Sequence, residues 1–124
     1  MNSKFTLLVR IVLGIILVVF GSNKFLHFLP LPPATGSAAE FMNSLGATGY
    51  IFPFVGILEV FIGVMLLLKK WVAFVLILLA PISINILLFH LFLDIPGASV
   101  AFLVAILNGI LIYKRWKYYS PLFA

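Results

Sequence analysis

The sequence contains no cysteine. This absence excludes disulfide bonds, thiolate metal ligands, cysteine-ligated iron–sulfur clusters and thiol-based redox catalysis. Any electron transfer by this chain would therefore depend on a bound cofactor. Gly-rich phosphate loops, nucleophile elbows and paired hydrolase carboxylates are also missing, so the common templates of soluble enzymes do not apply.

Charged residues are scarce. They make up 9% of the 124 residues, with only three acids, whereas apolar residues make up 65%. A soluble domain of this length could not hide so large an apolar fraction, because a small protein has little interior relative to its surface. The composition therefore excludes a soluble protein and predicts that much of the apolar surface faces lipid.

Four apolar segments approach the length of about 20 residues that a helix needs to cross a bilayer. They cover approximately residues 5–28, 50–68, 71–92 and 98–113. We predict an all-α, integral membrane four-helix bundle that forms a single membrane domain over residues 1–124. The first segment is expected to be a retained span and not a signal peptide, since Lys24 follows its apolar core and no small-x-small cleavage site is evident.

The distribution of basic residues predicts the orientation. Seven of the eight Lys and Arg residues fall on one side of the predicted membrane, namely Lys4, Arg10, Lys69, Lys70, Lys114, Arg115 and Lys117. The positive-inside rule places this side, with both termini, in the cytoplasm. The net charge is +5, but the basic residues lie beside the apolar runs and form no visible basic groove, so we expect no nucleic-acid partner.

The predicted outer loop over residues 29–49 contains a further helix. It begins with the stiff segment Leu-Pro-Leu-Pro-Pro, and Ser37 with Glu40 three residues later forms a capping box. An apolar stripe follows, made of Phe41, Met42 and Leu45. We predict a short amphipathic helix over about 37–45 that lies on the outer face as a lid; an ordinary structured connection is the alternative.

Rows of small residues indicate which helix faces point inward, because helices in lipid associate by close packing. Four polar residues, Arg10, Lys24, Glu59 and Asn108, share these rows and are expected inside the bundle. Asn85 is expected to be a second buried amide, on the stripe of the third span that also holds Pro81. Both amides would serve as interhelical hydrogen-bond partners or would orient a ligand carbonyl.

Glu59 is the strongest candidate for chemistry. Nine uncharged residues lie on each side of it within the second span, or roughly 14 Å of helix in either direction. An ionised carboxylate at that depth costs several kcal/mol unless it is paired, so such a residue marks a functional site by default. The alternative is a protonated Glu59 that only joins two helices through a hydrogen bond.

Arg10 and Lys24 are separated by about 21 Å of helix, which is less than the thickness of the hydrocarbon layer. At least one of them is therefore partly immersed. Either both side chains snorkel to opposite interfaces, or one of them pairs with Glu59.

His27 ends the first span, and His90 with Asp94 ends the third. A metal site that adds Glu40 to these residues, or haem ligation by the two histidines, are alternatives. Histidines that form ordinary hydrogen bonds at the membrane interface are favoured over both, so we predict no metal site.

Three stretches resemble the DoxX-like family of small four-span membrane proteins. They are Arg10-x3-Gly14 leading to Gly21-x2-Lys24, Gly56-x2-Glu59-x3-Gly63, and Ala80-Pro-Ile-x2-Asn85-x4-His90. The resemblance implies that Lys24, Glu59, Asn85 and His90 are polar positions within the bundle. Some members of this family are linked to quinone-dependent sulfur oxidation or oxidative-stress complexes, and distant relatives look like assembly chaperones.

Two functions follow as hypotheses. In the first, the chain is a subunit or accessory of a quinone-linked membrane oxidoreductase. Lys24, His27, Asn85 or His90 would contact a lipophilic ligand in the outer half of the bundle. Glu59 would hold or relay a proton, and a partner would supply electrons. In the second, it is a non-enzymatic assembly, lipid-binding or transport-accessory module. We expect membrane lipids and another membrane or redox protein as partners, a homo-oligomer as an option, and a location in the bacterial cytoplasmic (inner) membrane.

Overall fold

The computed structural model describes residues 3–124, and every regular element in that range is a helix, without strands. The four long helices are α1 (Ser3–Leu26), α3 (Ile51–Leu68), α4 (Val72–Leu93) and α5 (Ala98–Lys114). All are long and apolar enough to span a membrane, the fourth span being Ile95–Lys114 with the turn before α5 included. Short elements complete the chain, namely α2 (Gly36–Ala47) and the 3-10 turns η1 (Ile95–Gly97), η2 (Trp116–Tyr118) and η3 (Ser120–Phe123). The predicted fold class is confirmed.

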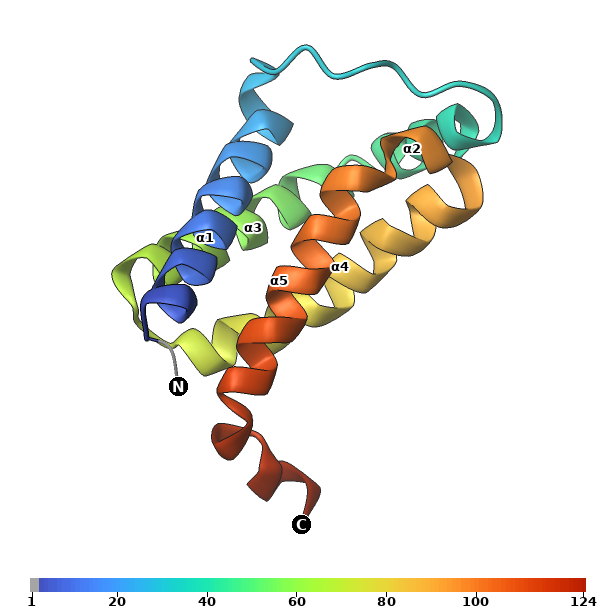
Figure 1. Ribbon diagram of the computed structural model, residues 1–124. Coiled ribbons are helices and arrows are strands. Elements are labelled where there is room, and N and C mark those ends of the chain that lie inside the picture. The colour runs from blue at the N-terminus through green and yellow to red at the C-terminus, as the bar shows by residue number, and fades with distance from the viewer. Residues whose placement is uncertain (1–2) are drawn as a thin grey trace.

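The long helices form two antiparallel pairs. α1 packs most extensively against α3, and α4 packs against α5 (Figure 1). α1 begins, α3 turns into α4, and α5 ends on one side of the bundle, which we call the terminal end (Figure 1). The opposite side, with α2 and the α4–α5 connection, is called the α2 end.

Left-handed residues end two of the helices. α1 ends at Leu26, two residues short of the expected limit at 28, and His27 follows it at φ 51°. Asn23 fixes the chain after the helix, because its Oδ1 accepts a 2.8 Å hydrogen bond from the Leu29 amide. At the terminal end, Lys69 and Trp71 have φ of 56° and 52°, and the Lys70 amide donates to the Met65 carbonyl at 2.9 Å. Such residues terminate a helix by turning the chain out of it.

The short helix α2 is present, but its predicted capping box is wrong. The N-cap position is Thr35, and no side chain caps the helix. Gly36, at φ +59°, turns the chain into the helix ahead of Ser37, so the Ser37 hydroxyl falls in the first turn and not at the cap. α2 packs on α3 and α4, with Phe41 stacked on Phe89 at a ring-centroid distance of 5.6 Å.

The large buried side chains gather toward the terminal end. The core there consists of Val9, Leu13, Leu17, Ile62, Leu66, Val72, Val75, Leu76, Leu79, Leu107 and Leu111. Beyond these residues toward the α2 end, the buried positions of the long helices are all small or polar: Gly21, Asn23, Gly56, Glu59, Ser83, Ala98 and Ala101. The two halves of the bundle are therefore held together by different means.

Candidate functional site

The contact between α1 and α3 is a close approach of two backbones at glycines. A Cβ on Gly63 would lie 2.7 Å from the carbonyl oxygen of Gly14, and one on Gly21 would lie 2.9 Å from the carbonyl oxygen of Gly56. Real Cβ atoms do not approach backbone oxygens so closely, so these positions admit only glycine at this helix spacing. The predicted packing of small-residue rows is confirmed for this pair of helices.

Lys24 and Glu59 form an ion pair across this contact. The Lys24 Nζ lies 2.5 Å from Glu59 Oε1, and the two side chains are 24% and 5% exposed. The glycines provide the room, because a Cβ on Gly21 would lie 2.9 Å from the Cβ of Glu59, and one on Gly56 would lie 3.2 Å from that of Lys24. Of the two basic residues considered for pairing with Glu59, the structure selects Lys24.

The charge of Glu59 is compensated by the Lys24 ammonium. Within residues 3–124, no second side-chain donor is found at the buried Oε1. Removing an ion from water costs several kcal/mol, and good geometry with further hydrogen bonds is needed to offset that cost. The site can therefore accept an additional donor at Glu59, and Lys24 can donate to an acceptor with its remaining N–H groups.

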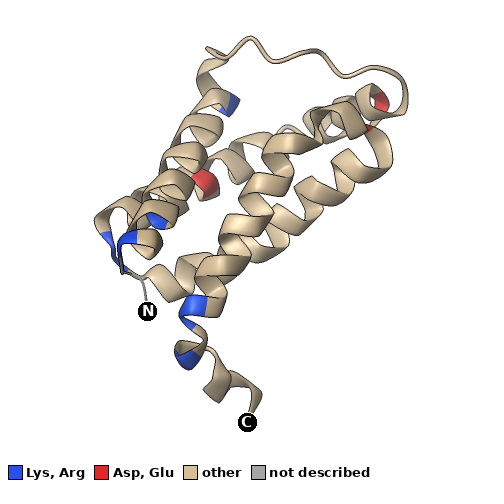
Figure 2. Cartoon of the chain, in the orientation of Figure 1, with Lys and Arg blue, Asp and Glu red and all other residues tan. Residues whose placement is uncertain are grey.

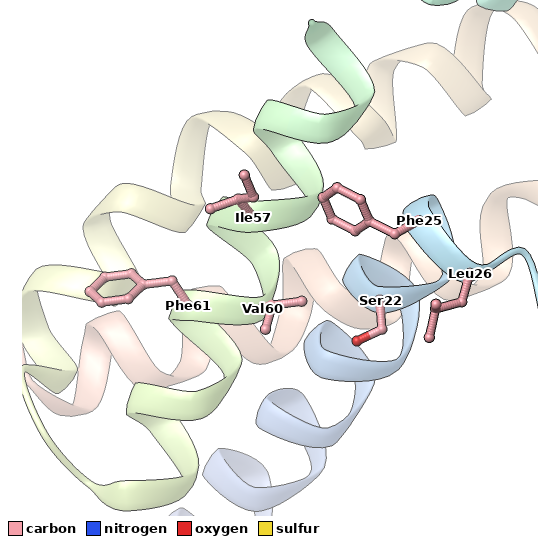
Figure 3. Close-up of a pocket in the computed structure, with 6 residues that line it drawn as sticks. All are labelled: Ser22, Phe25, Leu26, Ile57, Val60 and Phe61. Atoms are coloured by element: carbon pink, nitrogen blue, oxygen red, sulfur yellow. The ribbon is translucent and has the colours of Figure 1, made fainter.

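An apolar groove of about 470 Å³ opens between α1 and α3 at the level of this ion pair. Figure 3 shows its lining, which consists of Ser22, Phe25, Leu26, Ile57, Val60 and Phe61. These residues are neighbours in sequence of Lys24 on α1 and of Glu59 on α3, although neither charged residue lines the groove. The groove suits the lipophilic body of a ligand.

Arg10 is buried but has a different partner. Its guanidinium donates to the carbonyl oxygen of Leu66 and, at 3.5 Å, to that of Leu67. These carbonyls belong to the last turn of α3, where helix carbonyls lack partners within the helix and a positive charge is favourable. Arg10 therefore stabilises the end of α3 near the terminal end and takes no part in the Lys24–Glu59 pair.

Asn108 joins α5 to α4 as predicted. Its Nδ2 donates to the Leu76 carbonyl at 3.0 Å, and its Oδ1 lies 3.2 Å from the Ser83 hydroxyl, which donates to it. Both side chains are buried. This contact supplies polar links between two mostly apolar helices.

The prediction that Asn85 is buried is wrong. Asn85 is exposed, together with the rest of its stripe on α4, and its Nδ2 donates to the Pro81 carbonyl at 2.8 Å within the same helix. Ser83 is the inward residue, and a position two residues further along a helix points about 200° away from it. α4 carries apolar side chains on all of its faces, so hydrophobicity alone did not indicate which face points inward.

The histidines do not assemble into a metal site. His27 is exposed, and the His90 Nδ1 lies 3.2 Å from the Asp94 carbonyl oxygen and 3.3 Å from Asp94 Oδ2. Within residues 3–124, no group of three or more His, Asp or Glu side chains could hold a metal ion. The alternative that combined His27, His90, Asp94 and Glu40 is therefore not supported.

Three buried residues with polar groups are absent from the predicted site: Ser83, described above, Asn23 and Tyr119. Asn23 holds the exit of α1, and the hydroxyl of Tyr119, after α5, donates to the Ala73 carbonyl at 2.5 Å. For Asn23 a signal existed, because an asparagine near the end of a helix, shortly before Pro30, often bonds to the backbone of the exit. For Tyr119 none existed, because its partner lies 46 residues away.

Four long apolar helices, two of them joined by the Lys24–Glu59 ion pair, define a multi-pass membrane protein. Comparison with known families matches residues 5–91 to DoxX, and the chain belongs to the DoxX family. The matched segment runs from α1 into α4, so it contains Lys24 and Glu59 but not Asn108. No curated protein matches the chain. No solved structure matches it either.

Proposed function

We propose that this chain is a subunit or accessory of a quinone-linked membrane oxidoreductase that binds a lipophilic ligand in the α2 half of the bundle. The observation that carries the proposal is the buried Lys24–Glu59 pair, which lies where large buried apolar side chains give way to small and polar ones. A charge held at such depth is costly and is expected to serve a function.

The residues fit a quinone. When bound, a quinone carries electrons and protons on a ring whose two oxygens accept hydrogen bonds. Lys24 would donate to one of these oxygens, Glu59 would hold the proton that is exchanged there, and the groove along Val60 and Phe25 would take the apolar tail. Because the chain has no cysteine, the electrons would come from a partner redox protein.

His27, His90 and Asn85 belong to the same proposal as outer contacts of the ligand. His27 and His90 lie at the α2 end, and Asn85 lies on the exposed face of α4. They would orient the ligand, whereas Glu59 is the residue proposed to be catalytic.

Extraction of the purified protein tests this function. We expect organic extracts of the protein, isolated from its native membrane, to contain a quinone in a fixed ratio to the protein. Glu59→Gln keeps the size of the side chain and removes its charge, and should lose the quinone while the helical circular dichroism is unchanged. Glu40→Gln, a change of the same kind at an exposed residue of α2, is the control and should retain it. A quinone-free wild-type protein would refute the proposal.

A non-enzymatic module that docks another membrane protein is the second candidate. It is favoured by Asn85, an amide exposed on a mostly apolar helix, because such groups in a bilayer usually face protein or water and not lipid. A photo-reactive residue placed at position 85 should then cross-link to a partner in the membrane. A residue at exposed Leu91 of the same helix serves as the comparison.

We further propose that the protein lies in the bacterial cytoplasmic membrane with both termini in the cytoplasm. Lys and Arg gather at the terminal end (Figure 2), as the positive-inside rule requires for a cytoplasmic face. A fluorescent protein that folds only in the cytoplasm should be active when fused after Ala124. Alkaline phosphatase, which is active only outside, should be active when inserted in the α1–α2 connection.

A further inference from the structure

A second cavity, of about 300 Å³, lies at the terminal end of the bundle. Its lining includes Lys69 and Trp71 from the α3–α4 connection, and Arg115 and Tyr118 from the segment after α5. Phe74 of α4 also lines it. The Lys24–Glu59 pair and the groove of Figure 3 involve none of these residues.

The cavity is built by two structural devices. Lys69 and Trp71 both adopt the left-handed conformation, which makes the α3–α4 connection a tight turn, and both residues line the cavity. After α5, Tyr119 is 3% exposed and its hydroxyl donates to the Ala73 carbonyl of α4. This hydrogen bond ties the segment that carries Arg115 and Tyr118 to the start of α4.

The surroundings of the cavity are strongly basic. Lys70, Lys114 and Lys117 are neighbours in sequence of its two lining cations, while the three acids of the chain lie on α2, in the middle of α3 and after α4 (Figure 2). Tyr118 holds cations in place, since its ring centroid lies 5.2 Å from the Lys117 Nζ and 6.0 Å from the Arg115 guanidinium. Within the described chain, no carboxylate side chain is near enough in sequence to neutralise this end.

We infer that this cavity binds the phosphate of an anionic phospholipid from the adjacent leaflet. A guanidinium and an ammonium in the lining of one cavity match a phosphate, to which arginine donates two hydrogen bonds at once. Basic pockets between helix ends hold such head groups, and Trp and Tyr prefer the same depth in the membrane. Trp71 and Phe74 are 65% and 54% exposed, so their apolar surfaces are free to contact the acyl chains, which a free phosphate ion does not have.

Native mass spectrometry of the detergent-purified chain, titrated with phosphatidylglycerol or phosphatidylcholine, tests this inference. We expect the wild-type protein to retain phosphatidylglycerol about tenfold better than phosphatidylcholine. The double variant Lys69→Gln/Arg115→Gln should lose this preference. The control Lys70→Gln/Lys114→Gln removes the same charge from residues that do not line the cavity, and should keep it.

Two further measurements make the result decisive. Tyr119→Phe keeps every charge but removes the hydrogen bond to Ala73, and should weaken the preference through misplacement of Arg115. Should the double variant fail to fold, Arg115→Lys keeps the charge and should still reduce the preference. If the cavity and control variants lose the preference for phosphatidylglycerol equally, the lipid is attracted only by surface charge, and the inference is overturned. Displacement of the lipid by millimolar inorganic phosphate would overturn its assignment to a lipid.

Discussion

Gly63 of α3 faces the backbone carbonyl of Gly14 in α1 so closely that a Cβ on Gly63 would lie 2.7 Å from that oxygen. Gly21 and Gly56 repeat this relationship in the direction of the α2 end. The spacing of the two helices at these glycines determines whether Lys24 reaches Glu59. The packing of α1 on α3 and the geometry of the candidate site are therefore a single structural feature.

Substitution of Gly63 by alanine should destabilise the protein by about 1–3 kcal/mol, because the added methyl group must push the Gly14 backbone away. Gly109 of α5 is a matched control, since a Cβ there meets no atom within 4 Å. Gly109→Ala should be neutral or stabilising by up to about 1 kcal/mol, the usual gain in helix propensity. Unfolding by sodium dodecyl sulfate in mixed micelles measures both, and similar shifts in the two variants would contradict the close approach.

Loss of one partner of the ion pair should cost more than loss of both. Lys24→Met leaves Glu59 buried without its cation, and the expected cost is about 3–5 kcal/mol, the range for broken buried pairs. The double variant Lys24→Met/Glu59→Met removes both charges and should recover part of this stability.

A double-mutant cycle of the same unfolding measurement yields the coupling between the two residues. We expect the coupling to exceed about 1 kcal/mol, as for contacting residues. Purely additive effects of Lys24→Met and Glu59→Met would mean that the two side chains do not interact in the membrane.

The hydrogen bonds of Asn108 should stabilise the α4–α5 pair modestly. Asn108→Leu removes its contacts with the Leu76 carbonyl and Ser83, and should cost about 0.6–2 kcal/mol, the range measured for polar contacts between membrane helices. Asn85→Leu is the control, because that amide bonds only to its own helix. It should change the stability little, and a larger effect at Asn85 than at Asn108 would mean that the inward face of α4 has been assigned wrongly.

Long apolar runs and rows of small residues were enough to predict the four long helices, the burial of Glu59 and the position of Lys24 on the inward face of α1. They succeed because a spanning helix needs a long apolar run, and because close packing in lipid requires small residues. Glycines mark the inward face in α1 and α3, where the buried charges follow the same rows.

The same signals fail for α4. Inward and lipid-facing residues are equally apolar there, so the stripe that holds Pro81 and Asn85 was mistaken for the buried one, whereas Ser83 is buried. Sequence patterns within one helix also do not predict contacts between distant segments. The bond from Tyr119 to Ala73 and that from Arg10 to Leu66 each join residues more than 40 positions apart.

The Tyr119 phenol should make the stability of the chain depend on pH in the alkaline range. Burial raises the pKa of Tyr119, an effect that the charge of Arg115 partly opposes, so the folded chain holds this proton more tightly than the unfolded chain does. The stabilisation is therefore fully present below the unfolded pKa of about 10 and is lost as the pH rises through the raised value. The difference in free energy of unfolding between the wild-type protein and Tyr119→Phe should be constant from pH 7 to 9 and shrink above about pH 10.

Tyr118→Phe, at an exposed position, controls for removal of a phenol and should leave the stability at pH 7 unchanged. A difference for Tyr119→Phe that does not vary between pH 7 and 11 would mean that its hydroxyl is not buried against Ala73.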